Sequence, residues 1–499
     1  MPSPTLPELF KSVKLTPPTT PKPLIAASFV PLDDEKEKAL SIDERFMSAL
    51  AALLHNVKAV EPEPNSVDKP RFDKAAVIKV IEEIDKRIDK QMNEILHHED
   101  FQELEATWRG LEDLVSHTNL KGNVAIDLLD VAKSELAQDF ENNSADIFAG
   151  ALFEKVYIQE YDQYGGRPFG AMVGLYDFTS TKADLKWLGA MAKVANAAHC
   201  PFISAVSPKF FHFDTVTEME SVKDLEGALA HPRYGEWNKL RESEEAAYLG
   251  LTFPRYVLRL PWHPEKNPCD DLNFTEDSQG DSKKYLWGNS AILFARNMVK
   301  AFEQSGWCQS IRGPKGGGLI NGLPVDTFFL RGQEELKAPV EIAIPDYREY
   351  EFARCGFMPL VYRKSTSDAT FFSTQSAKVS KRFKDPKDQE NSQLVTNLAY
   401  TFSITRLAHY IKCIMRDNIG STADAAYIQR QLDAWLAGYV TTVASPDDLT
   451  VRRFPFKATS VEVVQRAGEI GWYDCKVAVL PHIQFEGLDV KLMLESRLG

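Results

Sequence analysis

Polar side chains on one predicted helix near the C-terminus are the strongest candidates for chemistry in this chain. Arg406, His409, Lys412 and Arg416 recur at three- and four-residue spacings, which places them roughly on one side of a helix. A buried basic row needs carboxylate partners, and Glu349 and Glu351 are the candidates. The set fits either an acid–base site or a structural polar network. We favour the structural network, because no GxSxG or other nucleophile signature accompanies it.

A glycine-rich segment, GPKGGGLINGLPV at 313–325, invites comparison with phosphate-binding loops. The Walker pattern GxxxxGK[ST] is absent around Gly313, and Asn321 stands where a dinucleotide fingerprint needs its third glycine. We therefore interpret the run as a tight loop in which two backbone segments approach closely. No cofactor is expected.

Two acidic or histidine-rich stretches raise the question of a metal site. The run HHED at 97–100 cannot aim all four side chains at one ion, since neighbours on a helix point about 100° apart. Asp270, Glu276 and Asp277 lack the order of a calcium loop. We expect a polar junction and a solvated loop, with no metal and no catalytic residue.

Length, charge and cysteine content argue against a nucleic-acid-binding, secreted or membrane-spanning protein. The chain has 499 residues, a formal net charge of -13, and six cysteines without a CxxC pair. An acidic surface disfavours nucleic acid, and scattered cysteines are typical of reduced thiols in a cytosolic protein. No apolar run is long enough for a membrane span, and the N-terminus is not a secretory signal.

The order of predicted helices and strands along the chain is typical of an α+β protein with mixed sheets flanked by helices. Apolar strand-like runs alternate with amphipathic helices from about residue 122 to 305, including the run NVAIDLLDV at 123–131. The segment 391–417 is apolar on most faces and predicts one long buried helix. The sequence 100–117 predicts a helix with one apolar face that packs in an ordinary core; this face comprises Phe101, Leu104, Trp108, Leu111 and Leu114.

The N-terminal region is predicted to be a mobile arm followed by helices. A short amphipathic helix in the proline-rich arm would present one apolar face, formed by Leu6, Leu9, Phe10 and Val13. A further helix is expected at about 35–57. A longer one at about 73–98 carries an apolar seam of Val77, Ile81, Ile84 and Ile88 between charged residues.

The C-terminus predicts three antiparallel strands. The last of them alternates a polar face with an apolar face made of Leu488, Val490, Leu492 and Leu494. A meander that ends in this way leaves a free edge, which must be covered or paired with another chain.

Seven strings in order along residues 75–499 carry a family resemblance. They are FQELEATWRGLEDLV, LTFPRYVLRLPW, YLWGN, GW with IRG, RCGFMPLVYRK, RLAHYIKCIMRDNIGS and the terminal GWYDCKVAVLPHIQFEGLDVKLMLESRL. Together they resemble the large subunit of the type VI secretion contractile sheath, the TssC/VipB/ImpC family.

The resemblance implies a structural protein of the bacterial cytoplasm. It implies an obligate heterodimer with a small sheath subunit, and many copies in a helical lattice around an inner tube protein. It also implies growth on a baseplate and recycling by an AAA+ unfoldase. On this basis the arm helix would be the unfoldase-recognition element, the seam on 73–98 would face the small subunit, and residues 488–494 would be the strand exchanged between subunits.

The implied organisation has four parts: an arm at 1–34, a helical region at 35–120 that pairs with the small subunit, a central α/β part at 121–385, and a C-terminal sheath domain at 386–499 with its linker strands. Two alternatives remain open. One is the sheath of a phage-tail-like injection particle, which would assemble without a small partner. The other is a cytosolic hydrolase built around His409.

Overall fold

The computed structural model describes residues 59–60, 71–72, 74–219, 222–270, 272–278, 281–330, 333–381, 383–443, 445–468 and 472–482. The predicted arm helix with Phe10, the predicted helix at 35–57, and the terminal strand with Val490 lie outside these residues. The chain divides into two compact units. The first comprises residues 1–98 and 261–279, and the second comprises 99–260 and 280–499.

The first unit is built around one long helix, α5 (Lys74–Leu96). Two short strands, β1 (Ala59–Val60) and β2 (Arg71–Phe72), pair antiparallel before it. The loop 261–278 is tied to the end of α5, because Asn93 accepts a bond from the Asp277 amide at 2.7 Å. Glu276, which is buried, accepts from the Trp262 amide and lies 3.4 Å from His97. The HHED run is therefore a polar junction, as expected.

A six-stranded mixed sheet forms the centre of the second unit, in the order β3-β4-β5-β11-β12-β8. Its first four strands are parallel and its last two antiparallel. The strands are β3 (Met172–Phe178), β4 (Phe202–Val206), β5 (Leu249–Phe253), β11 (Met358–Tyr362), β12 (Ala369–Phe371) and β8 (Leu319–Ile320). Two further pairs are β6 (Tyr256–Val257) with β7 (Trp287–Gly288) and β9 (Thr327–Leu330) with β10 (Gln333–Leu336).

Apolar side chains from helices cover both faces of this sheet. On one face Leu188 and Trp237 join a large core with Phe178, and on the other Phe294 and Phe402 pack with Phe371. The longer helices are α6 (Glu99–Ser116), α7 (Lys133–Asn142), α9 (Lys182–Ala197), α12 (Gly235–Glu242), α13 (Ala291–Ser305), α14 (Asp346–Arg354), α15 (Pro386–Val395) and α16 (Leu398–Asp417). The shorter ones include α8 (Ala151–Phe153), α10 (Val216–Met219) and α11 (Leu225–Leu229), and η2 (Glu154–Tyr161) is a π-helix.

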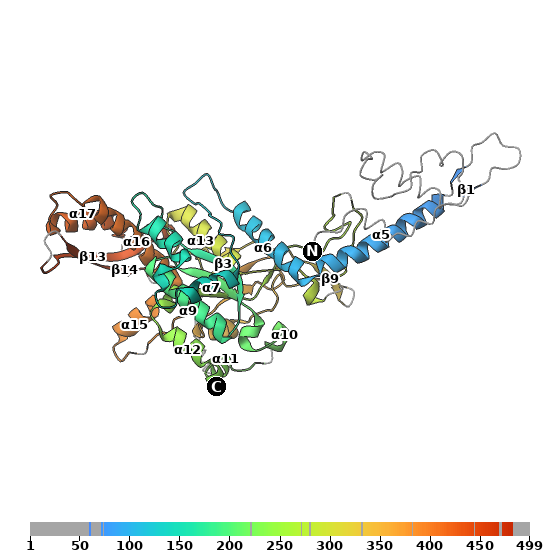
Figure 1. Ribbon diagram of the computed structural model, residues 1–499. Helices are drawn as coiled ribbons and strands as arrows, with labels where there is room; N and C mark the ends of the chain where they lie inside the picture. The colour runs from blue at the N-terminus through green and yellow to red at the C-terminus, as the bar shows by residue number, and fades with distance from the viewer. Residues whose placement is uncertain are drawn as a thin grey trace, which may run out of the picture. The chain divides into compact units, whose positions relative to one another are not determined.

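The C-terminal part of the second unit is a hairpin packed on a helix. The strands β13 (Phe456–Gln465) and β14 (Tyr473–Pro481) pair antiparallel, and α17 (Ala425–Ala437) lies against them (Figure 1). α18 (Asp448–Arg453) precedes β13. Leu432 is fully buried in the core that α17 shares with Val461 and Val463. The predicted α+β class, with mixed sheets and C-terminal antiparallel strands, is confirmed.

Three local predictions were wrong. Residues 123–131, all described, form no strand. The Val131 carbonyl accepts a hydrogen bond from the Tyr176 hydroxyl at 2.7 Å and not from a neighbouring strand. The expected single helix at 391–417 is broken, because Asn397 caps the start of α16 by accepting from the Ala399 amide. The prediction that the apolar face of α6 packs in a core was wrong for Leu104 and Trp108, whose exposed fractions are 56% and 62%, whereas Leu114 of the same predicted face is buried.

Candidate assembly surfaces

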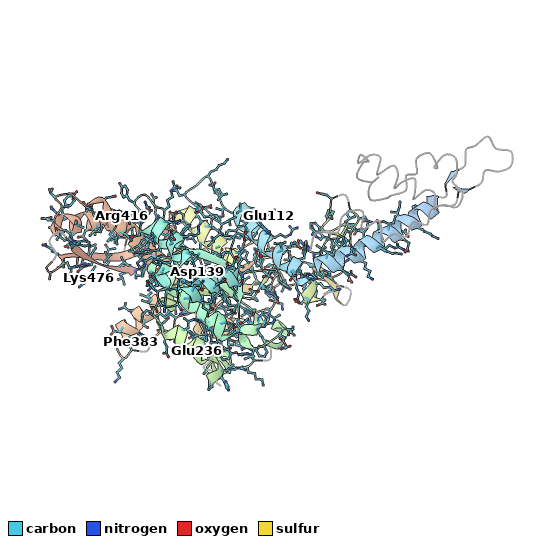
Figure 2. The ribbon with its side chains drawn as sticks, viewed as in Figure 1. Glu112, Asp139, Glu236, Phe383, Arg416 and Lys476 are labelled. Atoms are coloured by element: carbon cyan, nitrogen blue, oxygen red, sulfur yellow. The ribbon has the colours of Figure 1, made fainter. Side chains whose placement is uncertain are left out.

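The basic row of α16 lies against the end of the π-helix η2. Lys412 Nζ is 2.6 Å from Asp162 Oδ1, and Arg416 donates to the carbonyls of Gln163 at 2.8 Å and Tyr161 at 3.2 Å (Figure 2). Carbonyls at the C-terminal end of a helix carry partial negative charge, so cations there are stabilising. The row acts as a set of donors that fasten α16 to a neighbouring element.

Arg406 and His409 make separate contacts. The Arg406 guanidinium donates to the Gly306 carbonyl and stacks over the rings of Phe302 and Trp307, at 4.6 and 5.0 Å from their centroids. His409 Nε2 lies 3.1 Å from the Ala198 carbonyl, to which the neutral ring donates. Each side chain therefore joins α16 to a different neighbouring segment.

Burial is the main cause that lowers the pKa of His409 to about 4. The hydrogen bond that His409 donates to the Ala198 carbonyl opposes this shift, and the nearby His199 and Lys412 contribute to it. His199 is also held neutral by burial, which lowers its pKa, and its Nδ1 lies 3.2 Å from the Tyr248 hydroxyl. A histidine held neutral as a hydrogen-bond donor is a structural group. It is a poor general base at neutral pH.

Glu351, an expected carboxylate partner, lies elsewhere. It accepts a 3.0 Å bond from Arg348 on its own helix, α14. The carboxylate that meets the basic row is Asp162, which follows η2 and is 250 positions from Lys412 in sequence. No local spacing signals such a pairing, so it was missed. The set of Arg406, His409, Arg416 and Glu351 does not form one site.

The glycine-rich segment is a tight loop, as expected. Gly317 has φ of +96°, and a β-carbon there would collide with the Ser310 carbonyl. The Gly318 amide donates to the Gly313 carbonyl at 2.9 Å, which closes the loop on itself. Arg452 donates to the Lys315 carbonyl at 2.7 Å. These backbone groups are used within the protein and do not form a phosphate cradle.

The β13–β14 hairpin leaves most of its two outer edges unpaired; the exception is Phe456 at the start of β13, which forms a parallel bridge with Val440. The strands pair with each other from Phe456↔Pro481 to Gln465↔Tyr473, and among the described residues neither strand has a second ladder on its outer side. One face, with Val461 and Val463, is buried on α17. The other face is exposed and includes Lys476 (Figure 2).

A second surface lies on α5 in the first unit. Ile81 and Ile84 of the predicted seam expose 44% and 37% of their side chains, and Ile88 is half-buried. The neighbouring Ile78 is 44% exposed. The part of α5 that contains Ile78, Ile81 and Ile84 therefore exposes an apolar patch, which is typical of a surface that contacts another protein.

Two parts of the chain match protein families described as tail sheath domains. Residues 78–378 match a family described as "VipB: EvpB/VC_A0108, tail sheath N-terminal domain". Residues 387–498 match its companion, "VipB_2: EvpB/VC_A0108, tail sheath gpW/gp25-like domain". Among the described residues, no helix is both long and apolar enough to cross a membrane.

Individual proteins are also similar to this chain. The type VI secretion system sheath protein TssC1 of Pseudomonas aeruginosa is 40% identical over 425 residues, which is 84% of this chain and 85% of that protein. Two cryo-EM structures of the anti-feeding prophage are each 12% identical. Its six-fold symmetrised baseplate has a TM-score of 0.35, with 75% of this chain and 84% of that chain covered. Its contracted helical sheath has a TM-score of 0.31, with 62% and 67% covered.

The two family matches together span nearly the whole chain from residue 78 onward, and the TssC1 similarity covers 84% of the chain. The chain therefore belongs to the VipB (EvpB/VC_A0108) tail sheath family, and it is the structural large subunit of a type VI secretion sheath and not an enzyme.

Proposed function

We propose that this chain pairs with a small sheath subunit and that the heterodimers are linked through the β13–β14 hairpin into a contractile helical tube in the bacterial cytoplasm. The observation that carries the proposal is that, among the described residues, neither strand of that hairpin has a further ladder on its outer edge, and only Phe456 is bridged there. A two-stranded sheet is marginally stable by itself, and an exposed strand edge is a template for another strand.

Strand addition suits the task of a sheath. A helical tube needs head-to-tail contacts that repeat without closing into an isolated ring. Main-chain hydrogen bonds from an added strand would tether neighbours while side-chain contacts rearrange during contraction. The segment 488–494 offers the strand, since Leu488, Val490, Leu492 and Leu494 alternate with polar residues and would extend the buried face of the hairpin.

The exposed isoleucines of α5 support the pairing with a small subunit. Val77, Ile81, Ile84 and Ile88 recur near every turn, which is the pattern by which one helix packs along another. Exposure of Ile81 and Ile84 leaves this seam available to a helix of that subunit. The charged residues around it would set the partner's orientation.

Other partners follow from the same proposal. The heterodimers surround an inner tube protein and start from a baseplate, and contraction releases a higher-energy packing of the lattice without nucleotide on this chain. An AAA+ unfoldase recycles the contracted form through the arm helix with Leu6, Leu9, Phe10 and Val13. Phe10→Asp should leave tube assembly intact and slow sheath disassembly; unchanged turnover, followed by fluorescent sheath imaging in cells, would remove that claim.

Electron microscopy of co-expressed subunits tests the strand exchange. Val490→Asp should abolish tubes while the heterodimer still purifies, because a charge on the buried face of an added strand is costly. Lys491→Thr, on the opposite face of the same strand, is the matched control and should form tubes. Tubes of normal length with Val490→Asp would contradict the proposal.

The same experiment separates the two-subunit sheath from a phage-tail-like one. The proposal expects tubes only when the small subunit is present. Tubes formed by this chain alone would favour the phage-tail-like alternative, in which one sheath protein assembles without a partner.

A further inference from the structure

Helix α6 has two apolar faces, and the protein itself uses one of them. On the inner side Leu114 is buried with Ile292 of α13, and a β-carbon at Gly110 would be 3.4 Å from Ile292 Cγ1. Ion pairs fix the helix in place: Asp113 lies 3.1 Å from Arg296, and Glu105 lies 2.7 Å from Arg259. This side is therefore rigidly held.

The opposite side of α6 carries a second apolar stripe. At about 100° per residue, Leu104, Trp108 and Val115 fall within a narrow arc nearly opposite Gly110. The side chains in the stripe are 36% (Phe101), 56% (Leu104), 62% (Trp108) and 37% (Val115) exposed. An apolar stripe that includes a tryptophan, held on a rigid helix, is typical of an interaction surface.

The border of the stripe is acidic. Glu112, next to Trp108 and Val115 around the helix, is exposed (Figure 2), as is Asp100 at the other side of the stripe. The nearest cation on α6, Arg109, is already bonded to Glu105 at 2.7 Å. The C-terminal end of the helix adds partial negative charge. A complementary partner would have an apolar stripe flanked by Lys or Arg.

A second copy of this chain fits poorly, because it would bring the same acidic border against itself, and the chain as a whole carries a net charge of -13. A chain of different sequence is needed. We propose that the outer face of α6 is a docking site for a basic-flanked amphipathic helix of the small sheath subunit, with Trp108 as its central anchor. This inference rests on the proposed heterodimer and adds a surface on the second unit to the seam on α5.

Affinity measurements with the purified small subunit and the full-length chain test the anchor. Trp108→Ala should weaken heterodimer binding by about 30-fold or more, the loss expected when an interfacial tryptophan anchor is truncated. Tyr164→Ala removes an aromatic ring that is 77% exposed and belongs to the segment between η2 and β3, and it should leave the affinity unchanged. Equal thermal melting of both variants checks that the fold is retained.

Charge reversal tests the complementarity. Glu112→Lys should weaken binding several-fold at low salt, with the difference shrinking as salt rises, because exposed charges are screened. Glu236→Lys on α12 makes the same change of charge at an exposed site in another part of the unit (Figure 2) and should have little effect. Equal salt dependence in the two variants would contradict an acidic border that selects the partner.

Four results would overturn the inference. Wild-type affinity in Trp108→Ala would remove the docking site while leaving the heterodimer itself intact. A homodimer of the chain alone that Trp108→Ala dissociates in sedimentation would make a second copy the occupant. Faster hydrogen exchange of 99–116 when residues 1–58 are deleted would make the chain's own N-terminal segment the occupant. If the wild-type chain does not bind the small subunit at all, the proposed heterodimer fails together with this inference.

Discussion

Acidification should loosen the attachment of α16, because His409 must stay neutral in the folded protein. Its pKa is about 4 in the folded state, whereas an unfolded histidine titrates near 6.5. Since folding depresses the pKa, protonation favours the unfolded state. The stabilisation is fully present above pH 6.5 and is lost as the pH falls from 6.5 towards 4.

The size of the effect follows from the two pKa values. Between pH 7.5 and pH 5 this one residue should cost about 2 kcal/mol of stability. For a unit as large as the second one, that corresponds to a fall of about 2–3 °C in Tm. The groups that face His409 are His199, Lys412 and Tyr161. Of these, His199 also has a pKa lowered by burial, so its protonation would destabilise the folded state in the same pH range. It therefore needs its own control.

Thermal unfolding at a series of pH values provides the assay. His409→Gln keeps an N–H that can donate to the Ala198 carbonyl but cannot titrate, so its Tm should fall less than that of the wild type between pH 7.5 and 5. His199→Gln, measured in parallel, separates the contribution of the neighbouring ring. If wild type and His409→Gln lose the same number of degrees, the neutral, buried state assigned to His409 is wrong.

Three further substitutions test the packing of the second unit by denaturant unfolding. Leu432→Ala should cost about 2–5 kcal/mol, because the side chain is fully buried under the β13–β14 hairpin; a smaller loss would mean that this core collapses around the cavity. Gly317→Ala should cost at least about 2 kcal/mol, from its positive φ and the contact with the Ser310 carbonyl, whereas a neutral effect would argue against the tight loop. Arg259→Ala should cost about 3–5 kcal/mol by leaving the buried Glu105 carboxylate with one partner fewer; near-neutral stability would show that Arg109 alone suffices. Burial raises the pKa of Glu105, but its bonds to Arg259 and Arg109 outweigh this and lower it, so the loss should diminish at low pH.

The sequence was sufficient for the family and the fold class. Seven strings in register identified the sheath family, and the alternation of apolar runs with amphipathic helices predicted mixed sheets flanked by helices. Helix periodicity also located α9 and α5 to within a few residues, because the apolar positions of a helix repeat locally. The same local signal predicted that GPKGGG is a tight loop.

The tertiary structure decided which surfaces and partners those elements use. Helix periodicity placed Leu104 and Trp108 on one face, but whether another element covers that face depends on the fold, and here none of the described segments does. Lys412 was predicted to need a carboxylate, yet Asp162 was found only in three dimensions. Periodicity reports which residues share a side of an element. Which element lies opposite is set by packing between segments far apart in sequence, and no local pattern encodes it.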